Sequence, residues 1–282
     1  MSSSRNLTPS LAGQPPEVAL PLLVEQHGGR LYNLSLKLCR HREDAEDLVQ
    51  EIFLIAFRKW RQFHGTSRPT TWLYTIAARA CKRRRRKRAG EPRTIESLSA
   101  LLPSAEDQIA DFAALEGPLD HQLRREAREA IETGIARLPL HFRMPLVLKE
   151  IVELSIAEVA TILGLKQATV KTRVHRGRLL LRRELTRILP RSEAPAQDHA
   201  RQMCLDLLKA KQDALDRGVP FRMPHEELCL RCRAMFATLD LTQEVCESIG
   251  RGTMPTALRQ ILSDEFETLA SSGRDRRQET GR

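Results

Sequence analysis

Apolar residues recur at intervals of three and four positions in two long parts of the chain, residues 20–88 and 126–188. This spacing places apolar side chains on one face of an α-helix and is typical of amphipathic helices that pack in a core. The clearest set comprises Ala45, Leu48, Val49, Ile52 and Ala56. No stretch alternates apolar and polar residues for long enough to predict a sheet. The pattern therefore predicts an all-α fold.

Two segments beside the helical parts have the composition of linkers. Residues 89–125 carry several Gly and Pro residues with scattered acids, and RSEAPAQD at 191–198 has the character of a hinge. We therefore expect a disordered leader at 1–19, a helical domain at 20–88, a linker at 89–125, a second helical domain at 126–189, a hinge at 190–198, a small helical domain at 199–270 and a disordered tail at 271–282.

The sequence SIAEVATILGLKQATVKTRVHRGRLLLRREL, residues 155–185, predicts a helix-turn-helix. Its first helix has one apolar face, and Gly164 can close that helix in a left-handed conformation. Val170 and Val174 give the second helix an apolar face of its own. Two short amphipathic helices joined by such a turn are the arrangement that many DNA-binding proteins use.

The second helix of this motif carries a polar face opposite its two valines. The face and its flanks present short or basic side chains, namely Gln167, Ala168, Thr169, Lys171, Thr172, His175 and Arg176. Such side chains suit base edges and phosphates in a major groove. The alternative interpretation is a charged, solvated face on an ordinary helical pair.

Charge and composition favour a nucleic-acid partner. The formal net charge is +10, which predicts attraction to polyanions. No apolar run approaches the roughly 20 residues that span a bilayer, and the first residues lack a signal-peptide core, so we expect a cytoplasmic protein with no membrane contact. The chain has no phosphate-binding loop of the G-x-x-x-x-G-K-[ST] type and no Ser/His/Asp arrangement, so we expect no enzymatic activity.

The first helical domain begins with an acidic helix. The segment HREDAEDLVQEIFLIAF at 41–57 places Asp44, Asp47 and Glu51 on one face, opposite the apolar face. An acidic face could bind a partner, but acids near a helix start also complement the helix dipole in solvent. Both interpretations stay open on these residues alone.

A loop and a basic run follow. The segment WRQFHGTSRPTTWLYTIAARA at 60–80 predicts a loop, then a helix that Thr70 or Thr71 caps and Trp72 opens. The rings and hydroxyls of this loop could hold unstacked bases, although Trp72 equally suits a core. The run KRRRRKR at 82–88 favours phosphates without reading sequence, and a nuclear localisation signal has the same composition.

Three segments, in this order, resemble the extracytoplasmic-function (ECF) sigma factors of bacterial RNA polymerase. They are REDAEDLVQEIFLIAFRKW, the F-x-G-x-S loop with TWLYTIA, and IARLPLHFRMPLVLKEIVELSIAEVATILGLKQATVKTRVHRGRLLLRREL. The resemblance covers residues 20–188. It implies a region 2 domain, a linker that threads through the polymerase, and a region 4 domain.

The resemblance implies a role for each group of residues. The acidic face would dock on the β′ clamp helices of core polymerase through Asp44, Asp47, Gln50 and Glu51. The loop and basic run would bind the −10 promoter element through Phe63, His64, Ser67, Arg68, Thr71, Lys82, Arg83 and Arg84. The polar face that begins at Gln167 would read the −35 element, with the β flap as a further polymerase contact.

The chain departs from the family pattern at one place. Family members commonly carry an Asn and then an Asp after the TWL-x-x-IA segment, whereas this chain has Arg79, Ala80 and Cys81 before its basic run. We therefore expect its −10 contacts to depend more on phosphates and less on bases.

The segment HEELCLRC at 225–232 has the spacing of metal ligands. On a helix, His225, Cys229 and Cys232 would point to one side, and tetrahedral zinc would need a fourth ligand. The predicted zinc ligands are Cys204, His225, Cys229 and Cys232, with His199 or Cys246 as alternatives to Cys204. The region resembles the zinc-binding anti-sigma fold, whose Leu-Asp pair matches this chain if Cys204 is the ligand. Small buried residues in a helical core are the alternative interpretation of these cysteines.

These features together predict a sigma factor that is regulated in cis by a metal- or redox-responsive C-terminal domain. Its expected partners are core RNA polymerase and promoter DNA, and a separate anti-sigma factor is a further candidate. A helix-turn-helix regulator that binds duplex DNA without polymerase is the competing function. A zinc hydrolase would need an open coordination position, whereas three thiolates and one imidazole make a closed site.

Overall fold

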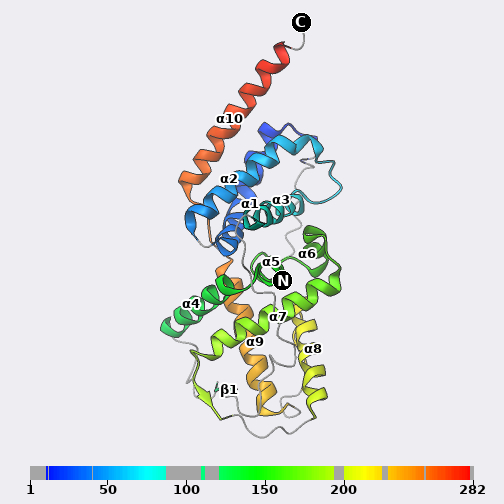
Figure 1. Ribbon diagram of the computed structural model, residues 1–282, viewed down its shortest axis with the longest axis vertical. Helices are drawn as coiled ribbons and strands as arrows, with labels where there is room; N and C mark the ends of the chain where they lie inside the picture. The colour runs from blue at the N-terminus through cyan, green and yellow to red at the C-terminus, as the bar shows by residue number, and fades with distance from the viewer. Residues whose placement is uncertain are drawn as a thin grey trace. The chain divides into compact units, whose positions relative to one another are not determined.

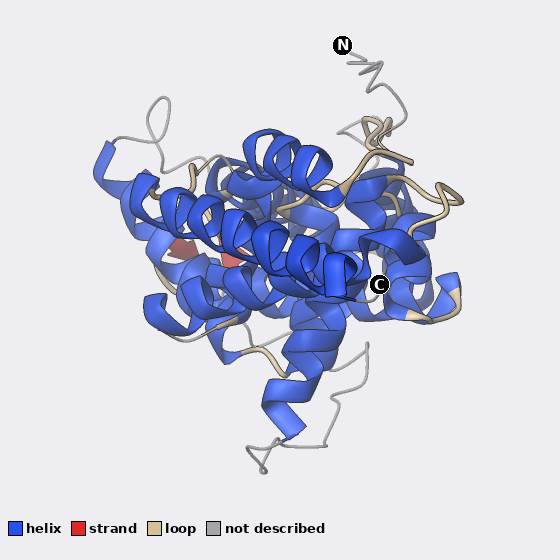
Figure 2. Ribbon diagram, turned by 90° about the horizontal axis from the view of Figure 1, so that it is seen from above, coloured by secondary structure: helices blue, strands red, loops and turns tan. Residues whose placement is uncertain are grey.

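The computed structural model describes residue 11 and residues 13–39, 41–86, 109–111, 121–193, 200–223, 228–250 and 252–279. Figure 2 shows that most of this part of the chain is helix, joined by loops, and the described residues also include two short strands. The all-α prediction is therefore confirmed. The chain divides into two compact units, one formed by residues 1–89 with 251–282 and the other by residues 90–250.

In its described residues, the first unit contains four helices and one 3-10 turn. They are α1 (Pro16–Leu38), α2 (Arg42–Lys59), η1 (Trp60–Gln62), α3 (Pro69–Arg86) and α10 (Thr256–Glu279). Each helix turns its apolar face inward, as the three- and four-residue spacing predicts. The fully buried side chains include Leu20, Leu31, Leu48, Ile52, Phe53 and Leu73.

Helix α10 packs against α1 and α2, the helices of the predicted first domain (Figure 1). Phe266 stacks on Phe57 with ring centroids 5.3 Å apart and meets Phe53 edge-on at 6.5 Å. A Cβ on Gly28 would lie 2.7 Å from the Met254 methyl group, so glycine is what lets the two segments approach. The last part of the chain therefore belongs to the core of the first unit.

Several expected boundaries differ from the structure; for example, helix α4 (His121–Arg137) begins inside the expected linker of residues 89–125. Helix α1 begins at Pro16, inside the expected leader of residues 1–19, because proline suits the first position of a helix. Helix α10 continues to Glu279, through most of the expected tail. The expected domain at 199–270 is divided, since α10 lies in the first unit.

The second unit contains six helices and a two-stranded ribbon in its described residues. They are β1 (Ile109–Ala110), α4 (His121–Arg137), α5 (Leu140–Glu150), α6 (Ile156–Leu163), α7 (Gln167–Thr186), β2 (Arg191–Ser192), α8 (Arg201–Arg217) and α9 (Leu230–Ile249). The strands pair antiparallel, with Ile109 opposite Ser192 and Ala110 opposite Arg191. The ribbon therefore ties the linker before α4 to the chain after α7.

Helices α6 and α7 form the predicted helix-turn-helix. Ser155 caps α6 by accepting a hydrogen bond from the Glu158 backbone N–H. The Glu158 carboxylate in turn accepts a hydrogen bond from the Ser155 backbone N–H, which completes a capping box. Gly164 ends α6 in the left-handed conformation, at φ 64°. Val170 and Val174 are fully buried, so α7 presents its opposite face away from this core.

Helices α8 and α9 pack against α7 rather than standing apart from it. A buried apolar cluster joins the three helices through Leu179, Leu208, Leu215, Leu228, Met235, Phe236 and Leu239. Helix α9 also packs along α4. The segment after the expected hinge is therefore part of the same compact unit as the helix-turn-helix.

We predict that Phe266→Ala destabilises the first unit by about 3–5 kcal/mol, because the truncation leaves a cavity against two buried rings. The measurement is chemical denaturation of the full chain followed by circular dichroism. Ile261 lies on the same helix but is exposed, so Ile261→Ala is the control and should change stability by less than about 0.5 kcal/mol. Equal effects of the two substitutions would show that α10 is not packed as described.

Candidate nucleic-acid interface

The residues predicted to read the −35 element all lie on helix α7. Gln167, Ala168 and Thr172 are exposed on the described surface, whereas Thr169 and Arg176 are half-buried. Their arrangement follows from the inward placement of the two buried valines, because a helix repeats every 3.6 residues. The N-terminal part of the predicted reading face is therefore exposed to solvent.

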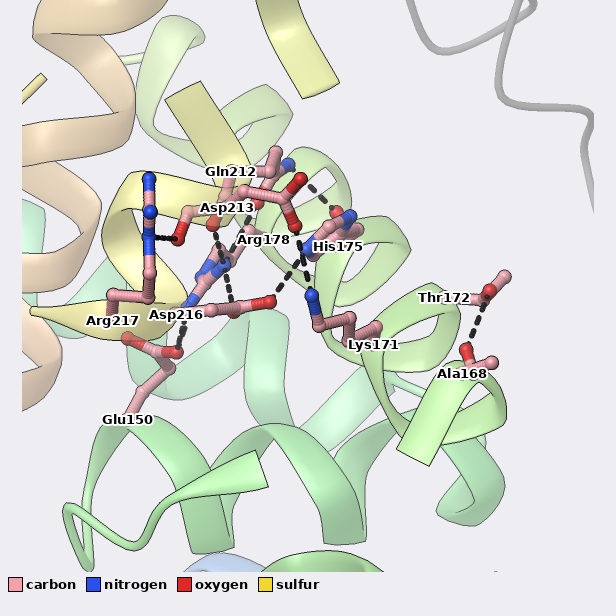
Figure 3. A network of polar contacts seen from close by, with 10 residues as sticks. All are labelled: Glu150, Ala168, Lys171, Thr172, His175, Arg178, Gln212, Asp213, Asp216 and Arg217. Atoms are coloured by element: carbon pink, nitrogen blue, oxygen red, sulfur yellow. Dashed lines mark hydrogen bonds and ion pairs between the residues drawn. The ribbon is translucent and has the colours of Figure 1, made fainter. Parts of the chain in front are cut away.

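Lys171 and His175, which also belong to this face, contact helix α8, as Figure 3 shows. Lys171 Nζ lies 3.1 Å from Asp213 Oδ1, and His175 Nε2 lies 2.9 Å from Asp216 Oδ2. The side chain of His175 is 15% exposed and that of Asp216 only 3%. Two residues predicted to meet DNA are therefore paired with acids of the C-terminal part of the chain.

Arg178, one turn after His175, is buried at the centre of the same network. Its guanidinium contacts Glu150 of α5 at 2.6 Å and Asp216 of α8 at 2.8 Å. It also donates to the Gln212 side chain at 2.9 Å. Burial acts to lower the pKa of Arg178, but the two carboxylates outweigh it and raise that pKa. Arg178 therefore stays charged and links three helices.

The pKa of Asp216 shifts in the direction that this network requires. Burial acts to raise it, but the hydrogen bond with His175 and the charge of Arg178 outweigh burial, so the pKa lies below its usual value of 3.8. The carboxylate is therefore held in its charged form within the contact.

The ligand atoms of His175, Asp213 and Asp216 lie within 4.8 Å of one another, a spacing that could suit a metal ion. Two cationic side chains already contact the carboxylates, since Lys171 pairs with Asp213 and Arg178 pairs with Asp216. A divalent cation bound here would have to displace these two cationic side chains or lie close to both positive charges. The group is better described as an ion-pair network.

The predicted polymerase-binding residues share one side of α2 in the first unit. Asp47 is exposed, and Asp44, Gln50 and Glu51 are half-buried. Together with residues of α3, the last three turns of α2 line a groove of about 720 Å³. Within that groove Glu51 accepts hydrogen bonds from Arg83 and, at 2.8 Å, from Arg84 Nε.

The structure thus brings the acidic face and the start of the basic run together. Burial acts to raise the pKa of Glu51, but the hydrogen bonds and charges of Arg83 and Arg84 outweigh it and lower the pKa. Lys82 is exposed beside them. Sequence spacing gave no indication that residues assigned to polymerase binding and to DNA binding would be neighbours.

The predicted −10 loop is only partly open. Phe63 is 8% exposed; its ring stacks on Trp60 at 5.1 Å and tilts against Trp72 at 5.4 Å. The ring therefore belongs to the protein's own aromatic cluster in this conformation, which differs from the expected stacking platform. His64, Ser67 and Arg68 are exposed, and the half-buried Thr71 accepts a hydrogen bond from Thr75 through its carbonyl.

The expected start of the helix after this loop was wrong. Helix α3 begins at Pro69 rather than Trp72, so Thr70 and Thr71 lie in its first turn instead of capping it. Proline fits the first helical position because it has no N–H to satisfy there.

Three of the predicted zinc ligands converge beside α7. The Cys232 thiol is within hydrogen-bonding contact of Cys229 and Cys204, and burial raises its pKa. The expectation that one helix carries Cys229 and Cys232 is wrong, because α9 begins at Leu230 and Cys229 is its N-cap in an extended conformation. His225 and the alternative His199 lie outside the described residues.

Cys246 is not the fourth ligand in this arrangement. It lies on α9, 14 residues beyond Cys232, which corresponds to about 21 Å along the helix. It is buried in the helical core, as small cysteines often are.

Comparison with known proteins identifies two segments of the chain. The family models for sigma-70 region 2 and sigma-70 region 4 match residues 23–91 and 128–181. The ECF RNA polymerase sigma factor SigW of Bacillus subtilis is 33% identical over 168 residues, which is 58% of this chain and 87% of the relative.

The chain belongs to the ECF sigma factors of the sigma-70 family.

Other similar proteins are also sigma factors. The RNA polymerase sigma-H factor of Pseudomonas aeruginosa is 30% identical over 61% of this chain and 88% of its own length. SigE of Mycolicibacterium smegmatis, an ECF RNA polymerase sigma factor, is 34% identical over 57% of this chain and 59% of its own length. A solved complex of the sigma factor RpoE with the anti-sigma factor NepR from Bartonella quintana is 28% identical and covers 55% of this chain and 89% of that chain, but its TM-score of 0.39 supports no inference.

As an ECF sigma factor, the protein acts in transcription initiation with core RNA polymerase and promoter DNA. The first unit holds region 2, and the second unit holds region 4 with α6 and α7 as its helix-turn-helix. Among the described residues, no helix is both long and apolar enough to cross a membrane.

We predict a pH-dependent contribution of Asp216 to stability. Its pKa is lower in the folded chain than in the unfolded one, so its stabilisation is present above about pH 4 and is lost as the pH falls through the lower, folded value. The free-energy difference between the wild type and Asp216→Asn, measured by urea denaturation, should shrink as the pH is lowered from about 6 to about 3. A difference that stays constant over this range would contradict the assignment.

Proposed function

We propose that this ECF sigma factor is regulated in cis by the part of its chain that follows region 4. The supporting observation is that α8 and α9 pack on α7 within one compact unit. Regulation of this kind needs a segment that is in contact with the functional face and is able to leave it. The ion pairs between α7 and α8 provide such a contact.

Within this function, region 2 would bind the β′ clamp helices through the acidic side of α2, and its loop and basic run would meet the −10 element. Region 4 would contact the β flap and read the −35 element with α7. All of these roles are binding roles, and we propose no enzymatic activity. A separate anti-sigma factor remains a further proposed partner.

We also propose that the C-terminal part holds a structural zinc ion. The donor chemistry fits, because Cys204, Cys229 and Cys232 converge and thiolates are preferred zinc ligands. His225 would complete the set, four residues before Cys229 in the sequence. A bound zinc would clamp the first turn of α8 to the start of α9.

Such a site would make the segment responsive to redox state. Zinc-bound thiolates can be oxidised with loss of the metal. Cys204 lies on the same helix as Asp213, nine residues earlier, which is about 13.5 Å along the axis. A change at the thiols would therefore be transmitted to the ion pairs through one helix.

The zinc proposal predicts one zinc ion per chain in protein purified under reducing conditions, measured by elemental analysis. The double substitution Cys229→Ser/Cys232→Ser should abolish metal binding and lower the melting temperature, because metal binding contributes to folding. Cys246→Ser is the matched control and should keep the metal. Loss of zinc in the control, or retention in the double variant, would contradict the ligand assignment.

The regulatory proposal predicts that the C-terminal part inhibits initiation. Run-off transcription from a promoter library should be several-fold higher with the full-length Cys229→Ser/Cys232→Ser variant than with the wild type, when each is assembled with bacterial core polymerase. Chelation or oxidation should raise the activity of the wild type towards that of the variant. Equal activity of the full chain under chelating, reducing and oxidising conditions would rule out metal or redox control.

A further inference from the structure

The DNA-reading face of α7 is partly occupied by two carboxylates of α8. We propose that Asp213 and Asp216 act as substitutes for DNA phosphates, so that region 4 reads the −35 element only after α8 has moved away from α7. This inference rests on the proposed regulation in cis and specifies its mechanism: the C-terminal part blocks promoter recognition rather than polymerase binding.

The first argument is the match in spacing and charge. Lys171, His175 and Arg178 follow one another at intervals of four and three residues, so they form one edge of α7. Asp213 and Asp216 are three residues apart and form the facing edge of α8. The two carboxylates contact Lys171 and His175, two of the predicted DNA-reading residues, at 3.1 and 2.9 Å, the geometry in which basic side chains also hold phosphate oxygens. Asp216 also reaches the buried Arg178 at 2.8 Å.

The second argument is steric. An α-helix with its side chains is about 10–12 Å across, and the major groove of B-DNA is about 12 Å wide. The groove can therefore accept α7 but not α7 with a second helix held against its reading edge. Gln167, Ala168 and Thr172 remain exposed, so the block falls on the C-terminal half of the face.

The third argument concerns the predicted polymerase-binding face of α2, which α10 leaves accessible within the first unit. Helix α10 packs on the side of α2 that carries Phe53 and Phe57. Asp47 is exposed. The contact with α8 therefore interferes with a DNA-binding surface, while the predicted clamp-binding residues are not covered by α10.

The fourth argument is that the outer part of the contact can be exchanged for phosphates. The Lys171–Asp213 pair is 44% and 34% exposed, and exposed ion pairs contribute little to stability because water and salt screen them. The contacts of Asp216 with His175 and Arg178 are buried and hold α8 more firmly together with the apolar cluster. Displacement of α8 therefore needs a polyanion that offers many phosphates at once.

The test uses the full chain and the substitution Asp213→Asn/Asp216→Asn, which removes both charges while keeping side-chain size. The probe is a library of duplex DNA with a randomised segment, used in rounds of selection followed by affinity measurement. We expect the wild type to enrich no motif and the variant to enrich one, with at least about tenfold tighter binding, because the competent state is no longer masked.

A control variant separates masking from net charge. Asp206→Asn/Glu244→Gln changes the net charge by the same two units. Asp206 is exposed and accepts a hydrogen bond from Gln202 within α8, and Glu244 is exposed on α9. The control should bind the library as the wild type does. A gain equal to that of the interface variant would overturn the proposal, as would the absence of any gain in the interface variant.

A second variant keeps the test decisive if the double variant does not fold. If circular dichroism shows that the double variant is unfolded, Asp213→Asn alone is used, because its half-exposed pair can be removed without opening the core. A gain of about threefold is expected, and no gain would overturn the proposal.

Pull-down with core polymerase separates a failure of the masking from a failure of the proposed function. Equal recovery of the wild type and the interface variant is the expected result. If neither is recovered, the proposed function in transcription regulation fails. If both are recovered and initiate transcription equally well, only the masking by Asp213 and Asp216 fails.

Discussion

The arrangement of the second unit depends on the buried charge of Arg178. A guanidinium removed from water must be matched by carboxylates and hydrogen-bond acceptors, or the unit loses several kcal/mol. Glu150 supplies one carboxylate from region 4 itself, and Asp216 supplies the other from α8. The same charge therefore stabilises region 4 and fixes the C-terminal segment beside the helix that reads DNA. His175 and Lys171 extend this interaction along the exposed part of the face.

The local features of the fold could be predicted from the sequence because they depend on neighbouring residues. Gly164 closes α6, and Val170 and Val174 orient α7, as their spacing indicated. The contact between α7 and α8 joins residues about forty positions apart, and the bond from Asn33 to the Gly252 carbonyl spans 219 positions. Periodicity shows which face of a helix is buried, but not which segment covers it.

The candidate site shows the same limit of prediction from the sequence. The residue types of the reading face were predictable, but their pairing with acids was not, because a charged face in the sequence is equally consistent with solvent, DNA or another helix. For Phe63 a nucleic-acid contact was predicted where the protein supplies its own contact. Its ring suits base stacking, but Trp60 and Trp72 pack against it in the structure. Spacing alone pointed to Cys229 and Cys232, and the resemblance to the anti-sigma fold favoured Cys204, although Cys229 caps α9 rather than lying within it.

The C-terminal part contributes to both units, with α10 in the core beside region 2 and α8 and α9 beside region 4. The most direct test of this account is hydrogen exchange of residues 201–217 in the full chain, before and after the polymerase holoenzyme binds a promoter that it selects from a library. We predict that α8 is protected in the free chain and loses protection when region 4 engages the −35 element. Undiminished protection of α8 in a complex whose α7 contacts DNA would contradict the central claim.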